Sequence, residues 1–517
     1  MQIRIKSRRL IFTTLFVSTA LISFNAFTVK KKRSIKEDGK GLFTIYCAAC
    51  HMLPDPASLT KTIWKMHVLP VMASRMGIIY PNYDPLKGLS PEERDIVNRN
   101  GIIPSKPMLT QKQWDMLQKY VISNAPDSVL LDETRLTRNS NLTQFERADI
   151  RVDEQLPSLI TGLKFNTETN TLWIGSYFNK VLTWKPRIGV IEVIRTQSPV
   201  VDFSFYQNST YFTQVGKLYP TELSIGAITK YNDSSTLIGS LHRPVNTVVD
   251  DLDNDGVPEM VVCNFGNKTG SLSLFKKVKA AKYKEEILSA LPGAIKCYVQ
   301  DMNGDGKKDI VAMFSQGDES VYIFYQTDKL RFKSLRVLRF PPNYGTTDMV
   351  LVDYNHDGLT DIVTVHGDNA DYSNILKPYH GVRLHINQGN AVYAEKFFYP
   401  IYGVTKVLAE DFDKDGDIDL AASAFFPDMG PLINESFVYL ENIDRDKYTF
   451  KPFNLKSDVP LKTLALEKAD IDGDGDIDII AGNFAQSPGA VPPELDQKWK
   501  SARHGLTIFL NNLIKAK

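Results

Sequence analysis

The sequence predicts a multidomain protein, in which a small all-α domain is followed by an all-β propeller of seven blades. Helical patterns occupy residues 36–46, 58–69 and 111–123, near the beginning of the 517-residue chain. Beyond residue 155 the patterns are those of short strands, and an acidic loop recurs there about every 50 to 60 residues. A repeat of this length with several strands in each unit indicates a solenoid or a propeller.

The clearest copy of the acidic loop runs from Asp411 to Asp419, with the sequence Asp-Phe-Asp-Lys-Asp-Gly-Asp-Ile-Asp. It places carboxylates at positions one, three, five and nine around a glycine at position six, a crowding of like charges that is unfavourable without a cation. Hard oxygen ligands around a sharp glycine turn suit Ca²⁺. The loop is not an EF-hand, because Ala422 stands at position twelve, where an EF-hand has a bidentate glutamate.

Five such loops predict up to five bound Ca²⁺ ions. The predicted ligands are Asp251, Asp253, Asp255, Glu259, Asp301, Asn303, Asp305, Asp309, Asp353, Asn355, Asp357, Asp361, Asp411, Asp413, Asp415, Asp419, Asp470, Asp472, Asp474 and Asp478.

These loops resemble the FG-GAP/VCBS repeat of integrin-type β-propellers over residues 155–517. The resemblance implies that each loop joins the first two strands of a blade and binds Ca²⁺. Two stretches before the first loop, beginning at Gly162 and Val200, have the same strand rhythm without a loop, which gives seven blades. We expect residues 142–152 to supply an outer strand that closes the ring against the last blade.

Residues 1–29 predict a secretory signal peptide or an uncleaved N-terminal membrane anchor. Lys6, Arg8 and Arg9 precede an apolar run from Leu10 to Val29, which is near the length that spans a bilayer. Both alternatives place the protein outside the cytoplasm, in the periplasm or at the cell surface. Attachment to the membrane through the N-terminus stays open.

Cys47-Ala48-Ala49-Cys50-His51 is the CxxCH pattern of c-type haem attachment, in which two thiols bond the haem and the histidine binds iron. A zinc site would need a second ligand pair, and a thioredoxin-like site would need a βαβ context. The other cysteines, Cys263 and Cys297, lie far from this motif, in the repeats. We expect them to form a disulfide or to be buried free thiols. Residues 36–126 resemble a small cytochrome c, which implies covalent haem c at Cys47, Cys50 and His51.

The second axial ligand of the iron has four candidates, Met72, Met76, Met108 and His67. Residues 64–72 resemble the tryptophan-to-methionine stretch of a group of small exported cytochromes c, which implies Met72. Met108 precedes the last helix, as the ligand does in many cytochromes c, but only two residues separate it from the Thr110 cap. We predict Met72, although an insertion at residues 77–105 departs from that pattern. Residues 127–154 are predicted to be a linker.

Three functions remain open. The first is electron transfer with a redox partner protein, the second is an extracellular ligand-binding or adhesion propeller with an accessory haem, and the third is an oxidoreductase with a propeller active site. The charge is balanced, with 61 basic and 60 acidic residues and no recognition motif, so a nucleic-acid partner is not expected. Quinoprotein propellers carry tryptophan-rich repeats, whereas this chain has five tryptophans. No catalytic residue is predicted, and electron transfer is the favoured function.

Overall fold

The computed structural model describes residues 38–129, 140–153, 157–279, 282–369, 375–455 and 457–513. The predicted export segment, residues 1–29, lies outside this part of the chain. Within the described residues no helix is both long enough and apolar enough to cross a membrane.

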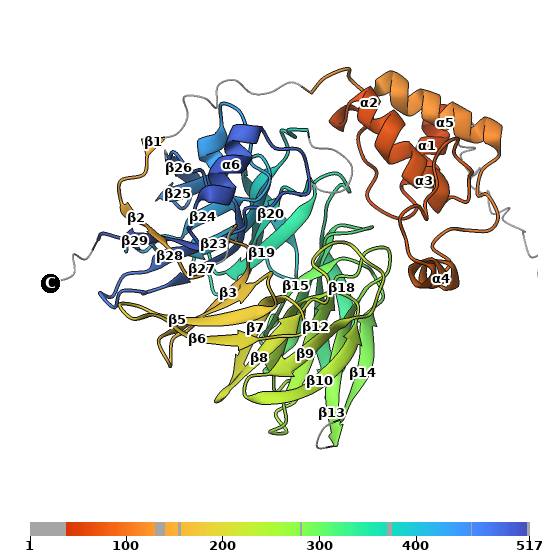
Figure 1. Ribbon diagram of the computed structural model, residues 1–517. Helices are drawn as coiled ribbons and strands as arrows, with labels where there is room; N and C mark the ends of the chain where they lie inside the picture. The colour runs from red at the N-terminus through yellow and green to blue at the C-terminus, as the bar shows by residue number, and fades with distance from the viewer. Residues whose placement is uncertain are drawn as a thin grey trace, which may run out of the picture. The chain divides into compact units, whose positions relative to one another are not determined.

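Seven antiparallel sheets form the β-propeller that the sequence predicts (Figure 1). Blades one and two contain β3–β10, which are Ile160–Asn166, Thr171–Ser176, Lys180–Lys185, Gly189–Arg195, Val200–Tyr206, Ser209–Gln214, Gly226–Lys230 and Asp233–Leu241. Blades three to five contain β11–β22, which are Pro244–Asp250, Glu259–Asn264, Ser271–Lys279, Lys282–Ser289, Ala294–Gln300, Asp309–Phe314, Ser320–Asp328, Arg331–Arg339, Thr346–Val352, Asp361–His366, Gly381–Asn387 and Tyr393–Pro400. Blades six and seven contain β23–β29, which are Val404–Glu410, Asp419–Ala424, Phe437–Asp444, Thr449–Asn454, Thr463–Ala469, Asp478–Asn483 and Leu506–Asn511.

The ring is closed by a strand that precedes all seven blades in sequence. β2 (Phe145–Ile150) pairs antiparallel with β29 and is the fourth strand of blade seven. A shorter strand, β1 (Ser140–Asn141), adds to the outer edge of blade six by parallel pairing with β26. The closing strand expected at residues 142–152 is thereby confirmed. The propeller consequently takes up part of the predicted linker 127–154, because the last blade has only three strands of its own.

The second strands of four acidic-loop blades are buried along their whole length. Every residue of β12, β16, β20 and β24 is buried, because each blade packs between two neighbours. The apolar runs that follow the acidic loops in the sequence are therefore the middle of the propeller wall. Two shorter helical elements interrupt the last two blades, η4 (Ile433–Ser436) and α6 (Pro493–Ser501).

Residues 39–124 contain the helices of the first part of the chain. They are α1 (Gly39–Cys47), η1 (Pro56–Ser58), α2 (Lys61–Ile63), η2 (Trp64–Val68), α3 (Leu69–Arg75), α4 (Pro91–Arg99) and α5 (Gln111–Asn124). The first and last of the three predicted helices are confirmed as α1 and α5. A capping box between Thr110 and Gln113 fixes the start of α5. These elements share one apolar core, in which Phe43, Trp64 and Trp114 are buried.

The second predicted helix differs from the expectation that it ends at Pro70. It continues through Pro70 to Arg75, and its middle, η2, is a π-helix. The N–H of Leu69 bonds back to the carbonyl of Trp64, five residues earlier. A proline lacks an N–H and clashes with the carbonyl four residues before it. The π turn ends just before Pro70, which then lies in the first turn of α3, where proline is tolerated.

Phe145→Ala tests the ring closure. The Phe145 ring packs edge-on against Phe412 and Tyr439 of blade six, at centroid distances of 6.0 and 5.3 Å. We expect its loss to lower the free energy of unfolding by about 3–5 kcal/mol, as for other buried aromatic truncations. Denaturant unfolding measures this. Ile191→Ala, at a 51% exposed position of β6, is the control and should change stability by less than about 0.5 kcal/mol. Equal effects of the two variants would contradict the closure.

Candidate functional site

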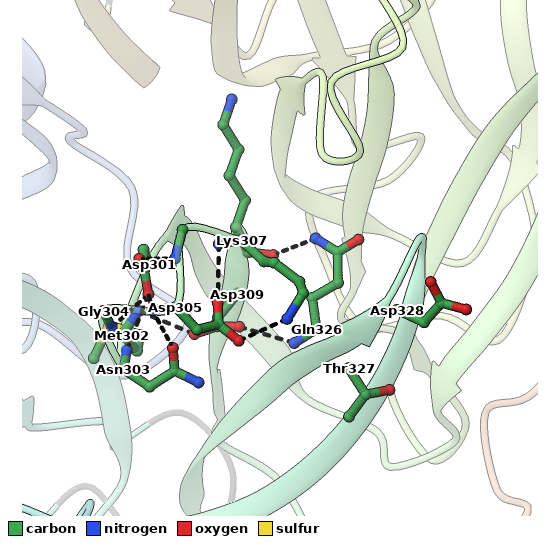
Figure 2. Close-up of polar contacts among 12 residues, drawn as sticks. Asp301, Met302, Asn303, Gly304, Asp305, Lys307, Asp309, Gln326, Thr327 and Asp328 are labelled. Atoms are coloured by element: carbon green, nitrogen blue, oxygen red, sulfur yellow. Dashed lines mark hydrogen bonds and ion pairs between the residues drawn. The ribbon is translucent and has the colours of Figure 1, made fainter.

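Each acidic loop joins the first strand of a blade to the second. Figure 2 shows the polar contacts of the loop that begins at Asp301. The Asp301 carboxylate accepts backbone hydrogen bonds from Gly304 at 2.8 Å and Gly306 at 2.7 Å. Asn303 Oδ1 accepts from the N–H of Asp305 at 2.9 Å. The side chains at positions one and three are therefore turned inward, into the curve of the loop.

The glycine at position six has the same role in all five loops. Its N–H donates to the first aspartate, and its φ is positive, between 80° and 99°. Only glycine adopts this conformation without strain, so the glycine in the sequence pattern determines the loop. The five glycines are Gly256, Gly306, Gly358, Gly416 and Gly475.

Three of the loops bring three carboxylate oxygens within 4.8 Å of one another. These groups are Asp251, Asp253 and Asp255; Asp411, Asp413 and Asp415; and Asp470, Asp472 and Asp478. The remaining two loops have asparagine at position three. Asp253 Oδ1 and Asp411 Oδ1 are buried atoms without a hydrogen-bond partner in the described structure. Buried oxygens of this kind need a partner, and a hard divalent cation such as Ca²⁺ fits this donor set.

The closing acid at position nine also accepts hydrogen bonds from the loop and from the third strand, which the sequence does not reveal. Asp419 is fully buried, and its Oδ1 accepts from the N–H of Asn442 on the third strand at 2.7 Å. Its Oδ2 accepts from the N–H of Phe412 at 3.3 Å and from the Tyr439 hydroxyl at 2.6 Å. The same two-sided bonding recurs at Asp309, Asp361 and Asp478. The closing acid thus clamps the loop to the second and third strands.

The charge of the closing acid is costly in this position. Burial, together with the charges of Asp413 and Asp415, raises the pKa of Asp419 to about 7. Burial likewise raises the pKa of Glu259 and Asp478 to about 7 and that of Asp361 to about 6. A cation in the loop would offset this unfavourable charge.

The CxxCH motif begins at the last residue of α1. Cys47 packs against the apolar core of the helices, and Cys50 is exposed in the following turn. His51 Nδ1 lies 2.9 Å from the carbonyl of Met52, and donation from Nδ1–H leaves Nε2 with its lone pair. Burial lowers the pKa of His51, which favours the neutral imidazole that binds metals. Two thiols and an imidazole with a free Nε2 fit the attachment of haem c.

The four candidate axial ligands lie in different surroundings. Met72 is half-buried and packs against the same apolar core as Cys47. Met76 is buried within that core, whereas Met108 is 51% exposed and His67 is exposed. Met72 packs against the same core as Cys47 without being fully buried in it, and it stays the predicted ligand.

Cys263 and Cys297 are buried free thiols, on β12 and β15 of neighbouring blades. This agrees with one of the two alternatives that the sequence left open. Burial raises the pKa of the Cys263 thiol, so it is not a reactive thiolate.

The comparisons with known proteins concern the propeller. Residues 301–364 match the sequence profile of a family described as FG-GAP-like repeat. A search of curated proteins gave no significant match. Similar solved structures are U3-55K (12% identity, TM-score 0.43, 70% of this chain and 98% of that one) and the RRP9 WD40 repeats (12%, 0.42, 70% and 97%). The Swd1 β-propeller domain of Myceliophteria thermophila is a third (9%, 0.43, 70% and 99%).

The strand pairing and the repeat match together describe a seven-bladed β-propeller with FG-GAP-like repeats. The match falls on the loop and strands from Asp301 to Thr364, which include two of the five acidic loops. The sequence did not identify the hydrogen-bond donors to the closing acids. For Asp419 the signal was present as Asn442 and Tyr439, but nothing in the sequence shows that they face the loop.

Two variants in one loop separate cation binding from the clamp. Asp415→Asn removes a proposed ligand charge, and we expect it to lower the melting temperature in Ca²⁺ but not in excess chelator. Asp419→Asn puts an NH₂ group against backbone or hydroxyl donors, so it should cost about 1–3 kcal/mol in both conditions. Calorimetry with and without chelator measures both. A wild-type melting curve that is unchanged by chelator would contradict the cation sites.

The pH dependence of the Asp419→Asn cost tests the buried charge. The folded pKa of about 7 lies above the unfolded value of about 3.9, so the stability that wild-type Asp419 contributes is lost as pH rises through this window. In excess chelator the cost of Asp419→Asn should therefore fall from pH 4 to pH 7. Urea titrations at each pH measure it. A cost that grows with pH would show that the carboxylate is stabilised when ionised.

Proposed function

We propose that this protein is an exported c-type cytochrome joined to a calcium-stabilised β-propeller, and that it transfers electrons to or from a partner protein. The observation that carries the proposal is the placement of Cys47, Cys50 and His51 at the end of α1. Cys47 lies on the apolar core of the helices, and His51 presents Nε2. The export segment at residues 1–29 is consistent with the compartment in which haem c is attached.

The residues of the helical part would divide the work as follows. Cys47 and Cys50 would supply the thioether bonds, and His51 would bind iron through Nε2, with its ring orientation held by the bond from Nδ1–H to the Met52 carbonyl. Met72 is the proposed second axial ligand. Haem c held in this way supplies one-electron transfer between its ferrous and ferric states.

The propeller would supply a rigid surface on which a partner docks. Binding of Ca²⁺ to the folded state alone stabilises it by RT ln(1 + [L]/Kd). Extracellular modules bind Ca²⁺ with Kd of about 10⁻⁴–10⁻³ M, so the loops would be filled outside the cytoplasm and poorly filled inside it. This agrees with an extracytoplasmic location.

The haem proposal is tested with the mature full-length protein. Acid–acetone should fail to extract the haem, and Cys47→Ser with Cys50→Ser should abolish covalent attachment. Cys263→Ser with Cys297→Ser is the matched control and should leave the haem spectrum unchanged. Met72→Ala should change the spectrum to high spin, whereas Met108→Ala should not. A matured protein without haem absorption would end the proposal.

The electron-transfer role needs a kinetic test. The reduced protein should be reoxidised rapidly by small cytochromes or copper proteins, and it should bind carbon monoxide slowly. Reduction of the haem by a substrate, with no other protein present, would instead indicate an oxidoreductase.

A ligand-binding or adhesion propeller is the second candidate, because the FG-GAP-like match covers residues of the propeller. In that case binding to an extracellular ligand would survive the Cys47→Ser and Cys50→Ser changes. Loss of partner docking only on removal of Ca²⁺ would fit either function, so the haem-free variant is the one that separates them.

A further inference from the structure

Neighbouring acidic loops are joined by the side chain at position four. His356 Nε2 lies 2.9 Å from the carbonyl oxygen of Gly416, in the next loop. Lys414 Nζ lies 2.7 Å from the carbonyl oxygen of Gly475, in the loop after that. The acceptor in both cases is the glycine at position six. Two different side chains thus make the same connection between successive blades.

The glycine that accepts this bond is also tied to its own loop. The N–H of Gly416 donates to Asp411 Oδ2 at 3.1 Å, and the N–H of Gly475 donates to Asp470 Oδ2 at 3.1 Å. Asp411 and Asp470 are the first proposed Ca²⁺ ligands of their loops. One residue therefore connects the first ligand of a loop to the fourth position of the loop before it.

The position-four residue is itself held between two proposed ligands. His356 lies between Asn355 and Asp357, and its backbone is in the left-handed region with φ of 56°. Lys414 lies in the same way between two aspartates, with φ of 59°. This region is unfavourable for residues other than glycine, so it is held by the surrounding loop. A cation that fixes positions three and five would also fix the direction of the side chain at position four.

The connections begin and end at definite loops. Position four is Gly304 in the loop before His356 and Gly473 in the last loop, and glycine has no side chain to reach a neighbour. In the first loop position four is Asn254, whose side chain makes no hydrogen bond to the next loop in the described structure. The group connected through position four is therefore the three loops that begin at Asp353, Asp411 and Asp470. The first two loops are joined by different contacts, because Lys308 Nζ lies 2.8 Å from Asp250 Oδ1 and Gln326 Nε2 donates to the carbonyls of Leu252 and Lys308.

We propose that these three loops bind Ca²⁺ as a coupled group, with His356 and Lys414 as the positioning residues that couple them. The proposal rests on the proposed Ca²⁺ binding of the loops. A cation in one loop orders the glycine of the next before its own cation arrives, so the second cation binds a loop that is already ordered and binds more tightly. The loops that begin at Asp251 and Asp301 lie outside this position-four coupling.

Native mass spectrometry of the full chain at increasing Ca²⁺ resolves the coupling, because it counts the ions on each molecule. Asp357→Asn disables the loop at the head of the group, and we expect the affinity of the next two loops to fall at least about 5-fold. Asp305→Asn disables, at the same position, the preceding loop, which has no side chain at position four. It should remove one ion and lower the affinity of the loops that begin at Asp411 and Asp470 less than Asp357→Asn does.

The positioning residues are tested by His356→Ala and Lys414→Met, singly and together, with Asn254→Ala as the matched position-four control. The double variant should still bind the full number of ions, but its intermediate ion counts should become populated as for independent sites. Asn254→Ala should keep the wild-type distribution. Removal of the Lys414 charge can raise mean affinity, so the distribution decides the outcome.

Two results would overturn the proposal in distinguishable ways. If the wild type already binds its ions as independent sites, or if Asp305→Asn and Asp357→Asn have equal effects, the coupling is wrong and the Ca²⁺ sites stand. If the folded chain binds no Ca²⁺, the sites and the coupling both fall.

Discussion

The buried closing carboxylate is the interaction on which the acidic loops of the propeller depend. At Asp419 both oxygens accept hydrogen bonds, one set from the loop and one from the third strand of the blade. An ionised carboxylate accepts on both of its oxygens, whereas an amide of the same size turns an NH₂ donor towards one of the two sides. The loop, the second strand and the third strand are thus fixed around a single buried charge, and the same arrangement recurs along the chain.

In that arrangement the ionised carboxylates repel one another, and a bound cation would offset this repulsion. Four acidic positions lie close together, and burial of the ninth makes its ionisation unfavourable, with the pKa of Asp419 raised to about 7. The backbone N–H groups that hold Asp411 and Asp470 are not enough to partner every oxygen, because Asp411 Oδ1 is buried and unpaired. The fold therefore supplies a shaped, charged loop, and a hard cation would supply the missing interaction.

The helical part is organised by a different constraint. Its apolar core holds α1 and α5 together, and the π turn before Pro70 keeps the middle helix continuous, so that Met72 comes to lie on the same core as Cys47. A helix that ended at Pro70 would leave Met72 in a loop. The proposed redox site thus depends on a backbone adjustment in η2, and the proposed cation sites depend on carboxylates in a rigid sheet.

The sequence by itself determined the number of blades, the positions of the acidic loops and the closing strand, because strand length and the sixth-position glycine are local properties. It also marked Cys47, Cys50 and His51. Tertiary structure decided what the sequence could not. Two donors to Asp419 come from Tyr439 and Asn442, which lie 20 and 23 residues further along the chain. The partner of His356 is Gly416 in the next blade. Such contacts depend on how sheets pack side by side, and no local pattern records which residues then face each other.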